Sequence, residues 1–435
     1  MICRHLLPAI LFCLPTHADW PQWRGPEGQG HSAEKQLPLK WSETENISWR
    51  TPLPGKGWSS PVIAGGQVWM TTALETKASP EEEARRLRAN TGDQPLNLLA
   101  RVELRALCVD AASGKLLHNV LLLDKQDPQW VHKLNSYASP TPVLDGGRLY
   151  CHFGTLGTVC MDTATQKIIW VNEDKDLQIM HENGPGSTPV VEAGVVIFHM
   201  DGSDRQFVAA LNAATGKLAW KVERSGKMHD NPQFKKSYGT PLAITANGQR
   251  QLISTGSDWV YSYDPATGQE LWKVAYGDLG FSITPRPLYH EGTVYIATGY
   301  GKSRMVAIKV EGTTQPEITW TFDKGAPTMP SPVLAGDLLY FVNDGGMITC
   351  VDTKGGTEVF RERLGEPFAA SPLAAAGHLF FPGREGKTYV IRASRSYEPV
   401  ATNVLDGLQF ASFAVEGNAL FIRTDKALYK VQDRH

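Results

Sequence analysis

Short hydrophobic segments alternate with polar, glycine-containing turns along almost the whole chain. The segment Leu149-Tyr150-Cys151-His152-Phe153 alternates with a period of two residues, which is typical of a β-strand. No long stretch of the sequence shows the 3.6-residue period of an amphipathic helix. The pattern therefore predicts an all-β protein.

One unit of this pattern recurs eight times. After its opening come a glycine turn, an apolar strand, a second strand that ends near Asp, and often a Thr-Gly turn before a strand that ends in Trp, as at Trp220 and Trp272. Four short strands per unit, with most units spaced by roughly 40–53 residues, are typical of propeller blades. Each unit opens on a small or hydroxyl residue, usually followed by Pro, with one arginine as an exception; the openings are Ser60, Thr141, Thr188, Thr240, Arg286, Ser331, Ser371 and Ser412.

The two ends of the repeat array predict how the ring closes. The last unit has three recognisable strands and ends near Val431, whereas the segment 47–50 precedes the first unit and carries Trp49 at the position of the repeat tryptophan. Pairing this segment with the last unit would remove an exposed strand edge. We therefore expect residues 47–435 to form an eight-bladed β-propeller of four-stranded antiparallel blades, closed by an N-terminal strand that completes the last blade.

One insertion, at about residues 73–103, separates the second and third strands of the first blade. Within it, Ser79 is followed by Pro80 and three glutamates. A hydroxyl cap, proline at the first helical position and acids in the first turn are typical of a helix N-terminus. The insertion therefore predicts a short helix that ends near Arg88.

The pattern Asp-x-x-Thr-Gly-x-x-x-Trp, seen at 264–272, resembles the repeat of the quinoprotein-type (PQQ-like) propeller family. That family includes quinoprotein alcohol dehydrogenases and the propeller lipoprotein of the bacterial outer-membrane barrel-assembly machine. The resemblance covers residues from about 47 to 431, and it implies that each repeat Trp packs between neighbouring blades. The segment 19–26, within an N-terminal extension at 19–46, also resembles the start of exported proteins of this family.

The first residues predict export. Arg4 precedes an apolar run from Leu6 to Leu14, and Ala18 provides a small residue at a cleavage site. This run is shorter than the ~20 residues of a membrane span. We expect a signal peptide at 1–18, cleavage after Ala18, a periplasmic or extracellular monomer, and no transmembrane segment. The net charge of −2 argues against a nucleic-acid partner.

The loops predict where a ligand would bind. In a propeller, loops that join one blade to the next share a face with the loops between the second and third strands. In this sequence those loops are longer and richer in polar and aromatic residues than the turns of the opposite face, which favours a binding mouth there over merely solvated loops. The candidate ligand-binding residues are Trp58, His132, Asn135, Tyr137, His181, Glu182, Asn183, His229, Asp230, Asn231, Tyr238, Asp258, Trp259, Arg304, Asn343 and Arg384.

Aromatic residues recur just before the first strands of the blades. They would either line the mouth of a central funnel or seal the inner ends of the blades, and the sequence leaves both interpretations open. These residues are Trp58, Tyr137, Tyr238, Phe281, Phe368 and Phe410.

The histidines and cysteines give two further expectations. No close pair of histidines has a recognised zinc spacing, and although ligands could converge from separate loops, structural histidines are favoured, so we expect no metal site. Cys151 and Cys160 face each other across a hairpin if Thr155 and Leu156 centre its turn. Because disulfides persist in exported proteins, we expect a Cys151–Cys160 disulfide.

Three functions are compatible with these residues. The first is a non-catalytic binding or scaffold protein of the cell envelope, whose partner is an envelope protein, a carbohydrate or a small molecule. The second is a PQQ-dependent dehydrogenase; the resemblance implies a Ca²⁺ site and often adjacent cysteines for such enzymes, and this sequence has no Cys-Cys pair. The third is a carbohydrate-active enzyme that uses His, Asp and Glu side chains of the loop-rich face. The first is favoured, with no cofactor expected.

Overall fold

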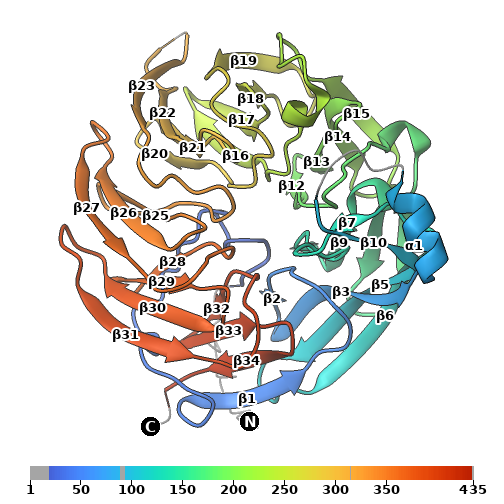
Figure 1. Cartoon of the computed structure of the whole chain (residues 1–435). Coiled ribbons are helices and arrows are strands. Elements are labelled where there is room, and N and C mark those ends of the chain that lie inside the picture. The colour runs from blue at the N-terminus through green and yellow to red at the C-terminus, as the bar shows by residue number, and fades with distance from the viewer. Residues whose placement is uncertain (1–18, 89–93, 314, 434–435) are drawn as a thin grey trace, which may run out of the picture.

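The computed structural model describes residues 19–88, 94–313 and 315–433. Within these ranges the chain forms eight four-stranded antiparallel sheets arranged around a central axis, as Figure 1 shows. The prediction of an all-β, eight-bladed propeller is therefore confirmed. The predicted signal peptide lies outside the described residues. None of the described helices is long and apolar enough to cross a membrane.

The blades follow the chain, each beginning with a short strand beside the axis. Blade 1 contains β2 (Val62–Ala64), β3 (Gln67–Lys77), β5 (Leu99–Asp110) and β6 (Leu116–Gln126), and blade 2 contains β8 (Val143–Asp145), β9 (Arg148–His152), β10 (Thr158–Asp162) and β11 (Ile168–Asn172). Blade 3 contains β12 (Val190–Glu192), β13 (Val195–Asp201), β14 (Gln206–Asn212) and β15 (Leu218–Glu223), and blade 4 contains β16 (Leu242–Ala246), β17 (Gln249–Thr255), β18 (Trp259–Tyr263) and β19 (Glu270–Ala275).

Blades 5 to 8 repeat the same order of strands. Blade 5 contains β20 (Leu288–His290), β21 (Thr293–Ala297), β22 (Met305–Lys309) and β23 (Glu317–Phe322), and blade 6 contains β24 (Val333–Ala335), β25 (Leu338–Val342), β26 (Met347–Asp352) and β27 (Glu358–Arg363). Blade 7 contains β28 (Leu373–Ala375), β29 (His378–Pro382), β30 (Lys387–Arg392) and β31 (Pro399–Val404), and blade 8 contains β32 (Ala414–Glu416), β33 (Ala419–Arg423), β34 (Ala427–Val431) and β1 (Ile47–Pro52).

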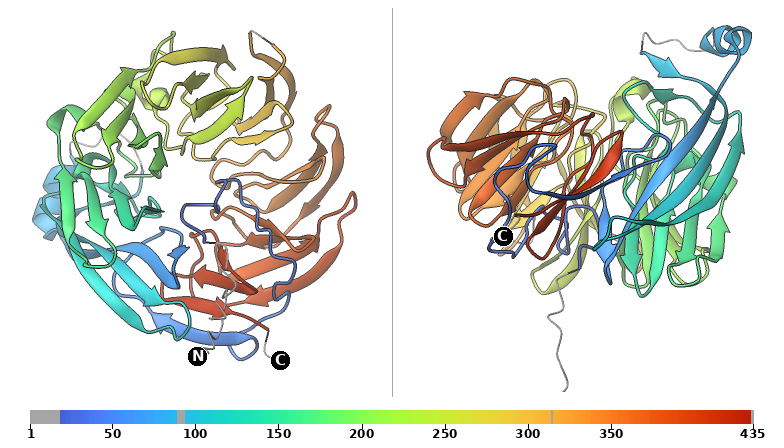
Figure 2. Two further views of the ribbon diagram at one scale, coloured as in Figure 1. Left: turned by 180° about the vertical axis from the view of Figure 1, so that it is seen from behind. Right: turned by 90° about the horizontal axis from the view of Figure 1, so that it is seen from below.

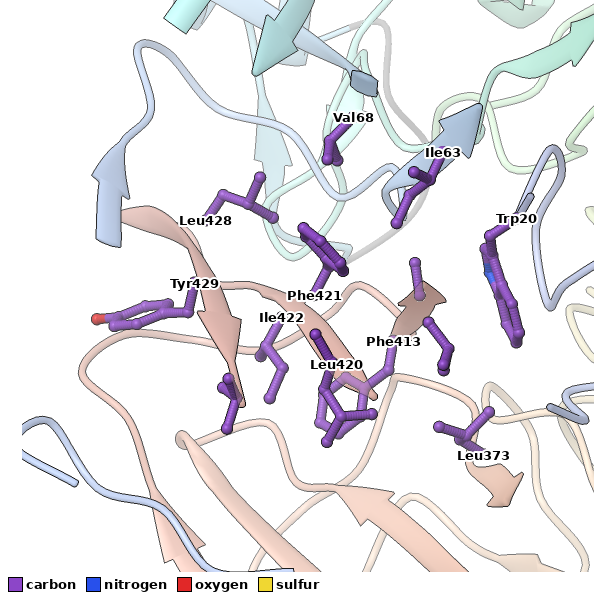
Figure 3. Packing of buried hydrophobic residues seen from close by; sticks show 14 of the residues in the cluster. Trp20, Ile63, Val68, Leu373, Phe413, Leu420, Phe421, Ile422, Leu428 and Tyr429 are labelled. Atoms are coloured by element: carbon purple, nitrogen blue, oxygen red, sulfur yellow. The ribbon is translucent and has the colours of Figure 1, made fainter. Parts of the chain in front are cut away.

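The ring closes as the sequence predicts, because β1 pairs antiparallel with β34, with Trp49 opposite Lys430. The seam has a continuous apolar core. Figure 3 shows Phe421 of blade 8 packed towards Ile63 and Val68 of blade 1, with Trp20 of the N-terminal extension beside them. Burial of this apolar surface joins the two ends of the chain.

A repeated tryptophan contact joins neighbouring blades at four of the eight junctions. The indole nitrogens of Trp49, Trp170, Trp220 and Trp320 each donate a hydrogen bond of 2.9–3.2 Å to a backbone carbonyl of the following blade. Each ring also lies against the glycine of that blade's third turn, as Trp170 does against Gly216, where an added Cβ would come within 2.5 Å of the ring. The packing that the family resemblance implied is therefore present.

The insertion in blade 1 projects beyond the ring. The helix predicted there is present as α1 (Pro80–Leu87), and the Ser79 hydroxyl accepts a hydrogen bond from the Glu82 N–H. Strands β3 and β5 continue into the insertion, which carries α1 away from the blades, as the right-hand view of Figure 2 shows. Within it, β4 (Leu96–Asn97) pairs antiparallel with β7 (Val131–His132) of the connection to blade 2.

The N-terminal extension lies across one end of the central channel, as the dark blue trace in Figures 1 and 2 shows. Trp20 exchanges two backbone hydrogen bonds with Ile63 of blade 1, and the Gly30 carbonyl accepts one from Ala374 of blade 7. The Arg286 guanidinium of blade 5 donates to the Trp23 carbonyl at 2.9 Å. The extension thereby ties together first strands from opposite sides of the ring.

A ring of hydrogen bonds explains the hydroxyl residues at the blade openings. In seven of the eight openings, a Ser or Thr hydroxyl accepts a hydrogen bond of 2.9–3.1 Å from the backbone N–H of the preceding opening. The last of these, from the Ser412 N–H to the Ser60 hydroxyl, crosses the seam of the ring. The eighth opening carries Arg286, whose side chain binds the N-terminal extension instead.

The predicted disulfide is wrong. Cys151 lies opposite Val159, and Cys160 lies opposite Tyr150, because the turn that begins at Gly154 shifts the register by one residue. A shift of one residue turns a side chain to the other face of the sheet. The two thiols are free and lie in different apolar clusters on the two faces of blade 2.

Candidate functional site

A cavity of about 900 Å³ occupies the axis of the ring, and we call it the funnel. All eight connections between blades contribute to its wall, together with Tyr300 and Asp344 from loops between second and third strands. Its mouth therefore opens on the loop-rich face. At the other end lie Trp23 of the N-terminal extension and hydroxyls of the blade openings, such as Ser412, which accepts a hydrogen bond from the Trp23 indole N–H.

The structure brings six of the predicted ligand-binding residues to the funnel wall: Trp58, His132, Asn135, Glu182, Asn183 and Tyr238. The other ten are absent from the wall: Tyr137, His181, His229, Asp230, Asn231, Asp258, Trp259, Arg304, Asn343 and Arg384. Whether any of the sixteen binds a ligand stays a prediction.

Several of those ten have structural roles that the sequence could not show. The Tyr137 side chain is fully buried and donates to the Gln129 carbonyl. His181 is 2% exposed, and burial lowers its pKa to about 3, so its ring is neutral. The Asn343 side chain accepts hydrogen bonds from the N–H groups of its own turn, whereas its neighbour Asp344 lines the wall.

The aromatic residues before the first strands divide between the two interpretations. Tyr137 and Phe368 are buried and seal the inner ends of blades. In contrast, Trp58, Tyr238, Phe281 and Phe410 line the funnel. The Trp58 and Phe410 rings are stacked, with centroids 4.4 Å apart.

A second aromatic group lies on the side of the funnel formed by blades 4 and 5. The Phe281 ring contacts the rings of Phe234 and Tyr300, with centroid distances of 4.5 and 5.6 Å. The Phe281 and Tyr300 backbones also exchange two hydrogen bonds, which fix this group in place. Tyr300 is 63% exposed at the mouth, so the group has open surface for a ligand.

Glu182 lies at the tip of a strained turn in the wall. Its φ is +61°, which is rare for a non-glycine residue, and the Asn183 N–H donates to the His181 carbonyl across it, forming a γ-turn. The Tyr238 hydroxyl donates to the same carbonyl at 2.6 Å, which reinforces the turn. Strained backbone held in this way clusters at binding and active sites.

The Glu182 carboxylate is held by three side chains. It accepts hydrogen bonds from the Lys236 ammonium at 2.8 Å, the Gln233 amide at 2.9 Å and the Ser203 hydroxyl at 2.9 Å. Partial burial would raise the pKa of Glu182, but these donors hold it below its ordinary value. The carboxylate is therefore ionised at neutral pH and its charge is balanced by Lys236.

Three wall residues were not predicted from the sequence: Lys236, Gln233 and Phe234, which lie in or beside a 3₁₀ turn at Pro232–Lys235. Trp23 and Trp130 of the wall were not predicted either. The Glu182–Lys236 pair joins residues 54 apart from adjacent blades. A search for oppositely charged residues in neighbouring loops of the same face could have found this pair, whereas only the fold places Trp23 in the funnel.

The described residues do not fit the cofactor of the family's dehydrogenases. No group of three His, Cys, Asp or Glu side chains among them is arranged to hold a metal ion. Of the described residues in the funnel wall, Lys236 is the only Lys or Arg, and Glu182 already pairs with it. Among the described residues, the wall therefore offers no cluster of three such side chains for a metal ion and no Lys or Arg that is free of a carboxylate.

Comparison with known proteins agrees with this architecture. The sequence profile of the family described as outer membrane protein assembly factor BamB matches residues 102–362 and 315–409. Two curated members of that name are similar: the Shewanella oneidensis protein is 22% identical over 244 residues, and the Yersinia pestis protein is 23% identical over 239 residues. Each match covers 52% of this chain and 57% or 53% of the relative, so the chain spans about half the length of the curated relatives it matches.

Solved structures show the same fold at low sequence identity. The crystal structure of BamB from Moraxella catarrhalis is 11% identical, with a TM-score of 0.52 over 83% of this chain and 99% of that one. The computationally designed Ika8 protein is 10% identical, with a TM-score of 0.56 over 88% of this chain and 100% of that one. Because the family profile matches more than half of the sequence, this chain belongs to the family of outer membrane protein assembly factor BamB.

Proposed function

We propose that this protein is an exported binding or scaffold protein of the cell envelope, and that its ligand or partner enters the funnel. The observation that carries the proposal is the asymmetry of the channel. The N-terminal extension lies across one end, while aromatic and polar side chains from all eight connections surround the other. A concave site with apolar walls and a few fixed polar groups is the usual form of a binding site.

The family supports the location in the envelope. The relatives are named outer membrane protein assembly factors, and the first eighteen residues have the pattern of a signal peptide. Fold alone does not determine function, so the proposal depends on the wall of the funnel. That wall offers rigid aromatic faces and a Glu182 carboxylate that is paired with Lys236, which suit recognition.

A photocrosslinking experiment tests this proposal. A benzophenone amino acid would replace Tyr300, which is exposed at the mouth, or Lys354, which is exposed on a turn of the opposite face. Irradiation of cells that export each variant should give adducts at position 300 and few at position 354. Adducts at 354 with none at 300 would contradict the proposal, because they would place the partner on the face that carries the N-terminal extension.

A further inference from the structure

We propose that the funnel binds a neutral carbohydrate chain of several sugar rings. This inference rests on the proposed binding function and gives the chemical class of the ligand. It follows from three properties of the wall: aromatic platforms on opposite sides, hydrogen-bonding groups in fixed positions between them, and the absence of a free cation among the described wall residues.

The aromatic platforms face each other across the funnel. The stacked pair of Trp58 and Phe410 precedes the first strands of blades 1 and 8, whereas Phe281 precedes the first strand of blade 5. In a ring of eight blades, blades 1 and 5 are diametrically opposite. A sugar ring presents a flat face of C–H groups, which packs on an aromatic face through dispersion and the attraction of C–H groups to the π-surface.

The polar groups lie between the two platforms, on the connections of blades 2 to 4. Glu182, Gln233 and Asn183 line the wall there, next to Asn135. A carboxylate has about four acceptor positions, and the described donors occupy three of those on Glu182. One acceptor position therefore remains for a ligand hydroxyl, and the three donors fix the orientation of the carboxylate.

The charges of the wall favour a neutral ligand. Lys236 has 2% side-chain exposure and is committed to Glu182, so an anion would meet the Asp344 and Glu182 carboxylates without a free ammonium or guanidinium among the described wall residues. Lys56 and Arg384 lie over the Trp58 and Phe410 rings at 5.8 and 6.0 Å as cation–π partners, and neither is among the wall residues. A ligand with hydroxyl groups and no net charge fits this arrangement.

The volume sets the size of the ligand. The cavity of about 900 Å³ lies at the upper end of the ~300–1,000 Å³ range of small-ligand sites. A single sugar would leave most of this space to water. A chain of several sugars would contact Trp58 and Phe281 together and bring its hydroxyls to Glu182.

Calorimetric titration of the purified protein tests the inference. The probes are three neutral trisaccharides (maltotriose, cellotriose and triacetylchitotriose), the acidic trigalacturonate and a neutral hexapeptide. We expect at least one neutral trisaccharide to bind with a Kd below about 1 mM, and trigalacturonate to bind at least tenfold more weakly. Trp58→Ala and Phe281→Ala should each weaken binding tenfold or more, and Glu182→Gln should weaken it at least threefold.

Two controls keep the result interpretable. Lys354→Glu, on the opposite face, should leave sugar binding unchanged, and the melting temperature of each variant shows whether it folds. If Trp58→Ala does not fold, Phe281→Ala and Glu182→Gln still test the wall from two other elements. Sugar binding that survives all three substitutions would place it outside the funnel and overturn the inference.

The outcomes separate this inference from the proposed function. If no neutral trisaccharide binds but the hexapeptide does, or adducts still form at position 300, the funnel is a binding site and the carbohydrate inference is wrong. If trigalacturonate binds more tightly than the neutral sugars, the charge argument fails. If nothing binds and adducts form at position 354 alone, both proposals are wrong.

Discussion

The Arg286 guanidinium donates a hydrogen bond of 2.9 Å to the Trp23 carbonyl, joining the opening of blade 5 to the N-terminal extension. Arg286 is the one blade opening that lacks a hydroxyl or small residue. It also donates to the Pro241 carbonyl, and Gly28 lies so close that an added Cβ would come within 2.3 Å of the guanidinium. The exception to the repeat is therefore one of the residues that hold the extension in the channel.

Arg286→Ser should loosen the extension while keeping the ring. Serine would give this opening the hydroxyl found at the other seven, but the Trp23 carbonyl would lose its donor. We expect hydrogen exchange of residues 20–32 to accelerate at least tenfold, while the β-strands of blades 2 and 3 keep their protection. Unchanged exchange in residues 20–32 would show that Trp20 and Gly30 hold the extension without Arg286.

Gly216→Ala should destabilise the protein more than Gly146→Ala. Both glycines have positive φ, but a Cβ at Gly216 would lie 2.5 Å from the Trp170 ring, whereas a Cβ at Gly146 would meet no atom within 4 Å. Gly146→Ala thus measures only the backbone cost of an alanine at positive φ. Gly216→Ala should lower the free energy of unfolding by about 1–3 kcal/mol more, because its Cβ would overpack against Trp170. Equal losses in urea denaturation would contradict the docking role of the tryptophan.

Asp201→Asn should be far more costly than Asp278→Asn. Asp201 and Arg224 form an ion pair at 2.7 Å with both side chains 1% exposed, and removing one partner leaves a buried unpaired charge. We expect a loss of about 3–5 kcal/mol in the free energy of unfolding. The matched control is the exposed Asp278–Lys302 pair, at 3.2 Å, where the loss should stay below about 1 kcal/mol.

Acid should destabilise the protein through buried histidines. Burial lowers the pKa of His152 to about 3 from its usual value of 6.5, so the unfolded chain binds a proton between these pH values that the folded protein does not. The stability from the neutral His152 is complete above pH 6.5 and is lost as the pH falls towards 3, by up to about 1.4 kcal/mol per pH unit.

His152→Gln should reduce the slope of stability against pH between 6.5 and 3, because glutamine does not bind the proton that histidine binds in the unfolded chain. The glutamine side chain can still form a hydrogen bond with the Thr158 hydroxyl. His229→Gln, on an exposed loop, is the control. Denaturant midpoints at pH 7, 6, 5 and 4 measure the slopes. Parallel curves for wild type and His152→Gln would contradict the assignment of a neutral, buried imidazole.

The sequence predicts the blades well because their signals are local. Alternation, the turn glycines and the helix cap at Ser79 each act within about ten residues, and the seam follows from counting strands around Trp49. The disulfide prediction failed because the assumed turn gave a strand register that is wrong by one residue. Cys151 pairs with Val159 and not with Cys160. Register is thus the point at which local patterns lose their predictive power.

The funnel could be predicted only in part, because its wall converges from distant residues. The long loops predicted the face on which the funnel opens, and six residues of the funnel wall were among the candidate ligand-binding residues. Sequence alone could not separate Phe281, which lines the wall, from the buried Phe368, since both precede a first strand. Nor could it place Trp23 at the inner end, a position set by Arg286 from more than 260 residues away.

The central claim is that recognition occurs in the funnel on the loop-rich face. The most direct test compares ligand binding by two sets of variants. One set is Trp58→Ala with Phe281→Ala in the wall; the other is Lys167→Glu, Lys217→Glu and Lys354→Glu in exposed turns of the opposite face. The measurement is the affinity of each folded variant for whatever ligand or crosslinked partner the wild type binds. We predict a loss of at least tenfold for the first set and less than twofold for the second; loss in the second set with an intact first set would contradict the claim.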